Sequence, residues 1–409
     1  MEIKTRFKKT PIGEIPEDWE VVRLGEIAQK IKTGPFGSQL RKSELTNSGI
    51  KVYTQDNVLR RDFSLGNLYI SPEKFKQLKS MEIKPGDILL TIRGTVGKAA
   101  VVPEGVEKGI IHTNLAIIRV GHGVLWPEYL ERIINDSEII LRQVHAARSS
   151  TTLPALYAGT IKRLKIPLPP LPEQKKIAEI LRTVDEAIEK TDEAIERTER
   201  LKKGLMQRLL TKGIKHERFK KTELGEIPEE WRILKLREVG KLSSGKPRPS
   251  KICENPSDSC RFPVLGGNGI LGYTSSFLIE YETIVIGRVG EYCGAVYKVP
   301  PKVWITDNAL YFREINRELN LDFLTYYLSW MNLNRFKKKS GQPLLTQSIL
   351  YELKLAVPSL SEQKQIAEIL STVDRKLELL RKRREKLERV KRGLMKDLLT
   401  GRRRVNCVD

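Results

Sequence analysis

The sequence has little cysteine and histidine, with four of each among 409 residues. Cys253 and Cys260 are seven positions apart, which is too far for a C-x-x-C pair, and no His-x-x-x-His accompanies them. The spacing therefore gives no sign of a structural zinc site. We expect reduced cysteines, as in most intracellular proteins, with a Cys253–Cys260 disulfide as the alternative.

Long apolar runs are also missing. Residues 1–19 are charged and contain no apolar core segment, so they do not resemble a signal peptide. The longest apolar stretches, such as Ile88–Leu90, are too short to cross a bilayer. We expect a cytoplasmic protein.

The motifs of nucleotide and methyl-donor chemistry are absent. The nearest approach to a P-loop, at Gly97 and Lys98, has Ile92 in place of the first glycine and Ala99 in place of the metal-binding hydroxyl. No G-x-G-x-x-G follows a strand to open a helix. The segment 255–258, Asn-Pro-Ser-Asp, lacks the second proline and the aromatic residue of an amino-methyltransferase signature. We expect no catalytic residue, no metal site and no cofactor in this chain.

Glu-x-Lys, a spacing that nucleases use to hold a metal and a water, occurs at 173–175 and 362–364. Both copies lie where a helix is expected to begin, and a glutamate there favours the helix dipole. We interpret them as helix starts, with a nuclease site as the alternative. A catalytic histidine shared by the two copies is not expected, because none is repeated among His112, His122, His145 and His216.

Positive charge is abundant. The 73 Lys and Arg exceed the 51 Asp and Glu, which gives a formal net charge of +22. Such an excess favours a polyanionic partner, usually nucleic acid. A basic protein of a thermophile or of the ribosome is the alternative, since charge alone does not separate these classes. The length suffices for two domains of ordinary size.

Two segments of the chain are repeated. Thr10–Trp19 recurs as Thr222–Trp231 at an offset of 212, and Leu171–Asp185 recurs as Leu360–Asp374 at an offset of 189. Each half therefore consists of a variable globular part followed by a helix. The globular parts differ in length by 212 − 189 = 23 residues. We expect them to share one fold while they perform different versions of one task.

The helical repeats carry apolar residues at 4-3 spacing, which is typical of a coiled-coil seam. Thr191 and Thr198 interrupt the first seam. The predicted seam residues are Ile177, Leu181, Val184, Ile188, Ile195, Leu205, Leu209, Ile366, Leu370, Val373, Leu377, Leu380, Leu387, Leu394 and Leu398. We predict an antiparallel coiled coil within one chain, with two unrelated surface helices as the alternative.

The globular parts show mixed helix and strand patterns. We expect strands at 86–92, 98–102, 115–120, 281–287, 294–299 and 309–313, and helices at 126–135 and 321–331. Arg93–Gly97 resembles Arg288–Gly294, which aligns the two arginines. The predicted fold class is α+β, with two mixed α/β domains separated by two long helices in a pseudo-twofold repeat. The predicted boundaries are 1–170, 171–213, 214–359, 360–404 and a tail at 405–409.

The repeated phrases carry a resemblance. Gly-Glu-Ile-Pro-Glu-x-Trp and Leu-x-Glu-Gln-x-x-Ile-Ala-Glu-Ile-Leu-x-Thr-Val-Asp, each present twice, resemble the specificity subunits of type I restriction–modification enzymes. Gly34–Leu40 also resembles a loop of their recognition domains. The resemblance covers essentially the whole chain, and the doubled helix motif is its strongest part.

The resemblance implies a non-catalytic DNA-binding subunit. Each globular domain would recognise one half of a bipartite double-stranded site, and the helices would set the spacing and dock two modification (adenine methyltransferase) subunits. Restriction (translocase and endonuclease) subunits would join that core. S-adenosylmethionine, ATP and Mg²⁺ would belong to these partners.

The residues that contact DNA are sought among basic and amide side chains in the loops, since Arg reads guanine, Asn or Gln reads adenine, and Lys holds phosphates. A solvated loop residue is the alternative for each. The candidates in domain 1 are Lys32, Ser38, Gln39, Arg41, Tyr53, Gln55, Asn57, Arg93, Thr95, Lys98, Arg148, Ser149 and Thr151. Those in domain 2 are Ser244, Lys246, Arg248, Asn268, Arg288, Lys339, Ser340 and Gln342. We expect Asn114 and Asn308 to be turn residues.

Other functions remain open from the sequence. One is the specificity subunit of a related system that cuts on both sides of its site. A second is a stand-alone nuclease with a divergent site, and a third is a helical scaffold without DNA affinity. Cutting by the pure chain would favour the nuclease, whereas the scaffold leaves the two dissimilar domains unexplained.

Overall fold

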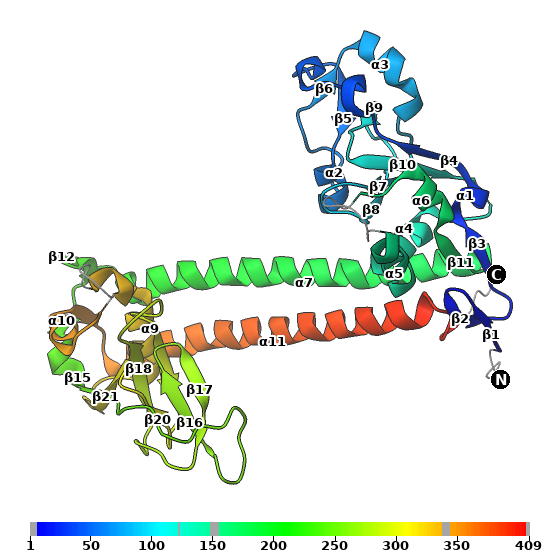
Figure 1. Ribbon diagram of the computed structural model, residues 1–409. Helices are drawn as coiled ribbons and strands as arrows, with labels where there is room; N and C mark the ends of the chain where they lie inside the picture. The colour runs from blue at the N-terminus through cyan, green and yellow to red at the C-terminus, as the bar shows by residue number, and fades with distance from the viewer. Residues whose placement is uncertain (1–5, 122, 148–154, 338–343, 406–409) are drawn as a thin grey trace. The chain divides into compact units, whose positions relative to one another are not determined.

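The computed structural model describes the chain except for residues 1–5, 122, 148–154, 338–343 and 406–409 (Figure 1). It contains two compact units. Unit 1 comprises residues 1–190 and 384–409, and unit 2 comprises residues 191–383. Each unit therefore holds one globular domain together with parts of both long helices.

Two helices far longer than the rest, α7 (Leu171–Lys212) and α11 (Leu360–Leu398), follow the two globular domains (Figure 1). The helix predicted at 171–213 corresponds to α7, which ends one residue earlier. The one predicted to reach residue 404 ends at Leu398 and is followed by a turn in which Gly401 has a φ of +70°. Every predicted seam residue is buried or half-buried. Among the described residues no helix is long and apolar enough to cross a membrane.

The strands of unit 1 form two main sheets and two short ribbons. The first sheet has the order β4-β10-β7-β8 and is antiparallel, and the second has the order β6-β5-β9 with β5 and β9 parallel. The ribbons pair β1 with β2 and β3 with β11. The bounds are β1 (Phe7–Thr10), β2 (Gly13–Pro16), β3 (Glu20–Arg23), β4 (Ala28–Thr33), β5 (Ile50–Tyr53), β6 (Tyr69–Ile70), β7 (Ile88–Thr91), β8 (Ala99–Val101), β9 (Gly109–Ile111), β10 (Leu115–Val120) and β11 (Lys165–Leu168).

The first sheet of unit 1 is buried on both faces. Ile88 and Leu90 point into a core shared with α4 and the start of α7, whereas Leu89 points into a second core shared with the other sheet. Successive strand residues face opposite sides, so covering both sides requires an unbroken apolar run. Besides its parts of α7 and α11, this unit contains the helices α1 (Leu24–Ile27), α2 (Gln55–Arg60), α3 (Pro72–Leu78), α4 (Pro127–Asp136), α5 (Glu138–Ala147) and α6 (Ala158–Arg163).

Unit 2 repeats this plan. Its sheets have the orders β15-β21-β18-β19 and β17-β16-β20, with ribbons β12-β13 and β14-β22. The strands are β12 (Phe219–Thr222), β13 (Gly225–Pro228), β14 (Arg232–Lys235), β15 (Gly240–Ser244), β16 (Phe262–Gly266), β17 (Gly269–Thr274), β18 (Thr283–Gly287), β19 (Val296–Val299), β20 (Trp304–Ile305), β21 (Ala309–Ile315) and β22 (Lys354–Val357). Besides its parts of α7 and α11, this unit contains the helices α8 (Leu236–Val239), α9 (Leu321–Trp330) and α10 (Gln347–Tyr351).

The two units differ mainly after the central strand of the smaller sheet. In unit 1, β5 leads into α2, β6 and α3 before β7 begins, whereas in unit 2 β16 turns directly into β17. This insertion supplies most of the extra length of the first globular part. The six predicted strands and two predicted helices of these domains are all present, and Asn114 and Asn308 lie in turns as expected.

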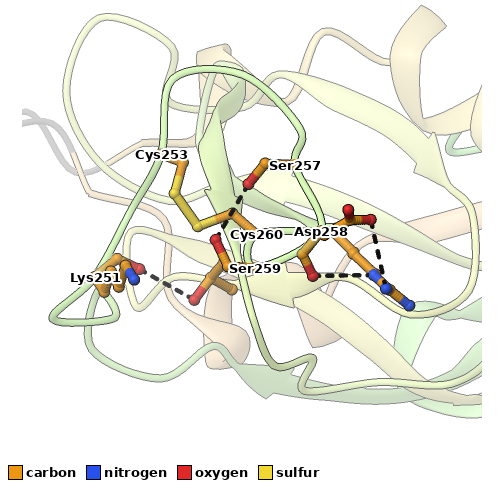
Figure 2. Close-up of a disulfide and its surroundings, with 8 residues drawn as sticks. Lys251, Cys253, Ser257, Asp258, Ser259 and Cys260 are labelled. Atoms are coloured by element: carbon orange, nitrogen blue, oxygen red, sulfur yellow. Dashed lines mark hydrogen bonds and ion pairs between the residues drawn. A yellow bond between two sulfur atoms is a disulfide. The ribbon is translucent and has the colours of Figure 1, made fainter.

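The prediction of reduced cysteines is wrong for one pair. Cys253 and Cys260 form a disulfide, with their Cα atoms 6.2 Å apart, while Cys293 is free and buried. Figure 2 shows this bond closing a loop that precedes β16. Backbone pairing of Cys253 with Tyr273, and of Ser257 with Cys260, brings the two sulfur atoms together. Sequence spacing carries no information about that pairing.

Candidate DNA interface

One edge of unit 1, here called edge 1, gathers the ends of several strands. The backbone amide of Gly34, just after β4, donates to Leu115 O (2.8 Å), and that of Ile92, just after β7, donates to Asn114 O (2.8 Å). The carboxyl ends of β4 and β7 therefore meet the amino end of β10. Gly34 permits this approach, since a Cβ atom there would lie 2.1 Å from a backbone oxygen of His112.

Side chains from two loops and from the first residue of α2 converge at edge 1. The Arg93 guanidinium lies 4.9 Å from the ring centre of Phe36, a cation–π contact. Phe36 is 43% exposed, so the pair faces solvent. Beside it, Gly94 has a φ of +71°, and a Cβ atom there would lie 3.1 Å from Gln55 Oε1. An arginine, an amide and an exposed aromatic ring suit contact with bases.

The equivalent edge of unit 2, edge 2, is built by the same backbone bonds. Gly245 N donates to Ala309 O (3.2 Å), and Arg288 N donates to Asn308 O (3.0 Å). The side chains differ from those of edge 1. Arg288 Nη1 donates to Ser244 Oγ (3.3 Å), and its Nε is buried with no hydrogen-bond partner among the described residues.

The sequence alignment of Arg93 with Arg288 is wrong by one residue. Ile92 N bonds to Asn114 O, and Arg288 N bonds to Asn308 O, so Ile92 and Arg288 occupy equivalent positions. Arg93 lies one residue further along the chain than Arg288. Since a shift of one residue along a strand reverses the side-chain direction, the two arginines serve their edges differently.

Most of the other candidates in the described part of the chain are exposed. Ser38 lies in the 3₁₀ helix Gly37–Gln39. The exposed candidates are Lys32, Gln39, Arg41, Thr95, Lys98, Lys246, Arg248 and Asn268. Six candidates lie outside the described residues: Arg148, Ser149, Thr151, Lys339, Ser340 and Gln342.

Two candidates are poorly placed for DNA contact. Tyr53 is fully buried, its hydroxyl donates to Glu107 O (2.6 Å), and burial raises its pKa to about 12. Asn57 is also buried, and its amide nitrogen donates to Asp62 O (3.0 Å) and Leu65 O (2.9 Å). Both residues stabilise the domain. A tyrosine in an apolar strand and an asparagine near a helix start are typical of such structural roles.

Sequence reasoning missed a group of exposed apolar and aromatic residues at or near these edges. Besides Phe36, Tyr157 is 57% exposed, Tyr292 is 46% exposed, and Ile270 and Leu271 are 59% and 44% exposed. All five lie within two residues of a glycine, which offers a sequence signal. That signal is weak, because isolated exposed apolar residues are common.

The repeated motifs meet inside each unit. Trp19 Nε1 donates to Glu173 Oε2 (3.0 Å) in unit 1, and Trp231 Nε1 donates to Glu362 Oε2 (3.1 Å) in unit 2. The glutamine after each glutamate is fully buried. Its oxygen accepts from the backbone amide of the residue just before α4 or α9, and its nitrogen donates to the carbonyl of a proline just before the long helix. The tryptophan of one phrase therefore binds the glutamate of the other, which fixes the helix to its domain.

The remaining lone pairs of these glutamates are also used. Arg404 donates to both oxygens of Glu173 and to Asp18, and in unit 2 Glu362 Oε1 lies 2.9 Å from His216 Nε2. Such saturated carboxylates act as structural anchors rather than as nuclease ligands. In the part of the chain that the structure describes, no group of three or more His, Cys, Asp or Glu could hold a metal ion.

The deciding observation is a family match over most of the chain. The model of the type I restriction modification DNA specificity domain matches residues 16–197 and again 228–389. The chain belongs to this family. Its members are the non-catalytic specificity subunits of type I restriction–modification systems, and the double match coincides with the two units that share one fold.

Relatives of nearly equal length support this assignment. The chain is 31% identical to the type I restriction enzyme MjaVIII specificity subunit of Methanocaldococcus jannaschii, over 98% of this chain and 96% of that protein. It is 32% identical to the putative MjaX specificity subunit of the same organism, over 98% and 97%. A solved type I S subunit from M. genitalium has the same fold, with a TM-score of 0.62, 18% identity and coverage of 93% and 96%.

Proposed function

We propose that this specificity subunit recognises a bipartite DNA site, with edge 1 contacting one half-site and edge 2 the other. The observation that carries the proposal is a shared backbone with different side chains. Both edges use the same strand ends and the same hydrogen bonds, yet edge 1 presents Phe36, Gln55 and Arg93 whereas edge 2 presents Ser244 and Arg288. Two variants of one scaffold suit two different short sequences.

We further propose which contacts carry sequence information. Arg93, Arg288 and Asn268 would reach base edges, because guanidinium and amide groups form paired hydrogen bonds with guanine and adenine. Gln55 would contact a base through its amide nitrogen only, since its Oε1 is buried. The exposed lysines and Arg41 would hold phosphates instead, and these contacts position the protein without reading sequence. The net charge of +22 supports many such phosphate contacts.

The spacing between the half-sites would come from an antiparallel coiled coil of α7 and α11. Within unit 1, Lys391 Nζ lies 2.7 Å from Asp185 Oδ1, and within unit 2, Lys202 Nζ lies 2.6 Å from Asp374 Oδ1. In an antiparallel pair one residue number rises as the facing one falls, so facing residues keep a constant sum. Both pairs give 576, which fits a single register. Domain 1 leads into the amino end of α7 and domain 2 follows its carboxyl end.

The catalytic steps would belong to partner subunits. We infer that two methyltransferase subunits bring S-adenosylmethionine, and that restriction subunits bring the ATP and Mg²⁺ used for translocation and cleavage. The chain would direct both to the site that its domains recognise.

Exchanging one domain tests the proposal. Residues 222–350 would be replaced by the matching segment of a relative, and the hybrid would be expressed with a methyltransferase partner in cells lacking other adenine methylation. Mapping of methylated adenines should reveal a site in which one half has changed and the other half and the spacer have not. A change in both halves, or in neither, contradicts the proposal.

A further inference from the structure

The hairpin of β16 and β17 ends in two adjacent exposed apolar side chains. Ile270 and Leu271 follow Gly269, the first residue after the turn, and are 59% and 44% exposed. Single exposed apolar residues are ordinary, whereas adjacent ones form a patch, and exposed apolar patches mark interaction sites. Neither residue belongs to the hydrophobic cores of unit 2.

The backbone of the tip aims both side chains. Leu265 pairs with Ile270 and Val264 pairs with Gly272, so Leu271 is the extra residue of a β-bulge. Bulges re-aim side chains and are frequent beside functional sites. The Leu271 side chain lies over Gly266, where a Cβ atom would be 2.8 Å from Leu271 Cδ1.

The tip is continuous with edge 2. A Cβ atom on Gly267, in the turn, would lie 3.3 Å from Asn308 O and 3.5 Å from Gly287 Cα. Gly287 precedes Arg288 in the chain, and Asn308 O accepts the hydrogen bond from Arg288 N. Asn268 is the second residue of the turn. The Tyr297 hydroxyl also donates to Gly266 O. The two apolar side chains therefore stand beside the polar groups that we propose to contact bases.

The base of the hairpin is held from both sides. Tyr273 pairs with Pro263 of β16 on one side and exchanges two backbone hydrogen bonds of 2.8 Å with Cys253 on the other. The disulfide joins Cys253 to Cys260, and Thr274 Oγ1 donates to Lys251 O (3.1 Å) (Figure 2). An apolar tip on such a fixed base resists bending when it is pressed against a partner.

The charge around the hairpin selects a nucleic acid as that partner. The loop that leads from β15 to the disulfide carries three exposed basic residues, Lys246, Arg248 and Lys251, whereas Arg261 at its end is paired with Asp258. In DNA, charged phosphates lie beside stacked apolar bases. Basic side chains beside an apolar tip can therefore bind the phosphates while the tip contacts the bases. Proteins that insert an apolar wedge between bases unstack one step and kink the duplex there.

We propose that Ile270 and Leu271 form an apolar wedge that enters the base stack at one step of the half-site contacted by edge 2. This inference rests on the proposed function, because it requires that edge 2 binds DNA. The corresponding point of unit 1, after β5, is occupied by α2, which begins with Gln55. Unstacking by this device is therefore confined to the second half-site.

Fluorescence of 2-aminopurine measures such unstacking. The chain in complex with a methyltransferase partner would be bound to duplexes carrying the mapped recognition site, with the probe placed in turn at each position of the second half-site. We expect a fluorescence rise at one step besides the target adenine, which the methyltransferase itself extrudes. In Ile270→Ser/Leu271→Ser the rise should vanish and specific binding should weaken at least tenfold, with an unchanged salt dependence.

Matched variants keep the result interpretable. Leu224→Ser makes the same chemical change at an exposed turn of the β12–β13 ribbon and should alter neither signal, while Ile270→Leu should retain both. The wedge is wrong if the unaltered complex shows no unstacked step, or if the double variant keeps one. It is equally wrong if the double variant only fails to assemble with the methyltransferase, since the tip then serves a protein partner. Failure of the proposed function would differ, because the unaltered complex would show no preference for the mapped site.

Discussion

In the proposed recognition of DNA, an arginine and its neighbours decide which bases each edge can distinguish. Arg93 rests on the Phe36 ring, which fixes the plane of its guanidinium, whereas Arg288 is tied to Ser244 and leaves its Nε without a hydrogen-bond partner among the described residues. A fixed guanidinium loses little freedom when it forms a paired hydrogen bond with guanine. The two edges therefore hold the same chemical group in different orientations.

Removing either arginine should relax one half-site only. We expect Arg93→Ala to reduce discrimination at one base pair of one half-site by about 1–3 kcal/mol, and Arg288→Ala to do the same in the other half-site. Binding of the methyltransferase complex to duplexes with single base changes measures this. The control is Lys246→Ala, for which we expect a uniform loss and a shallower salt dependence. Equal weakening of both half-sites by Arg93→Ala would contradict the assignment.

Arg404 ties the last turn of the described chain to unit 1, and its ion pair with Asp18 gives that contact a pH dependence. The Arg404 hydrogen bond is the main cause that lowers the pKa of Asp18 below its usual 3.8. A carboxyl whose pKa is lowered by folding contributes stability above its unfolded pKa and loses it as the pH falls through the folded value.

Asp18→Asn should therefore destabilise unit 1 near neutral pH but not in acid. The pair is partly exposed, so we expect roughly 0.5–1 kcal/mol at pH 7, and no difference from the unaltered chain once the pH is below the folded pKa. Urea unfolding at both pH values measures this. The exposed neighbour Glu17 offers a matched control as Glu17→Gln. A loss of equal size at both pH values would show that the ion pair is not its cause.

At the scale of the elements, the sequence predicts those strands and helices whose buried faces leave a regular pattern of apolar residues. The runs that became β7, β10, β18 and β21 were recognisable because both faces of their sheets are covered, and the long helices were recognisable from their 4-3 spacing. What failed depends on contacts between distant segments. The disulfide depends on the backbone pairing of Cys253 with Tyr273. The structural equivalence of Arg288 with Ile92, rather than with Arg93, follows only from the hydrogen bond of Arg288 N to Asn308 O.

The candidate residues follow the same division. Glycine-flanked basic residues such as Arg93 and Lys246 were found because loops at strand ends are rich in both. Tyr53 was misjudged because a tyrosine in a short strand looks alike whether its hydroxyl meets DNA or Glu107 O. Ile270 and Leu271 were missed because two adjacent apolar residues usually indicate a buried position. Only the bulge and the turn of the hairpin show that these two are exposed.

At the scale of the whole molecule, the proposed antiparallel pairing of α7 and α11 predicts that helix length sets the spacing between half-sites. In the register fixed by Asp185 with Lys391, residue 188 faces residue 388. Inserting one heptad after residue 188 and one after residue 387 therefore lengthens both helices at facing positions and preserves the 4-3 seam. The rod grows by roughly 10 Å at about 1.5 Å per residue.

DNA rises about 3.4 Å per base pair, so the non-specific spacer of the recognised site should grow by up to about three base pairs, with both half-sites unchanged. The gain is smaller where the added length turns the second half-site around the duplex axis and the domain follows it. Mapping of methylated adenines in cells that express the variant with its methyltransferase measures the spacer. The same heptad placed in α7 alone is the control, and it should abolish methylation because the two seams no longer face each other. An active double-insertion variant that keeps the original spacer would show that the helices do not measure the distance.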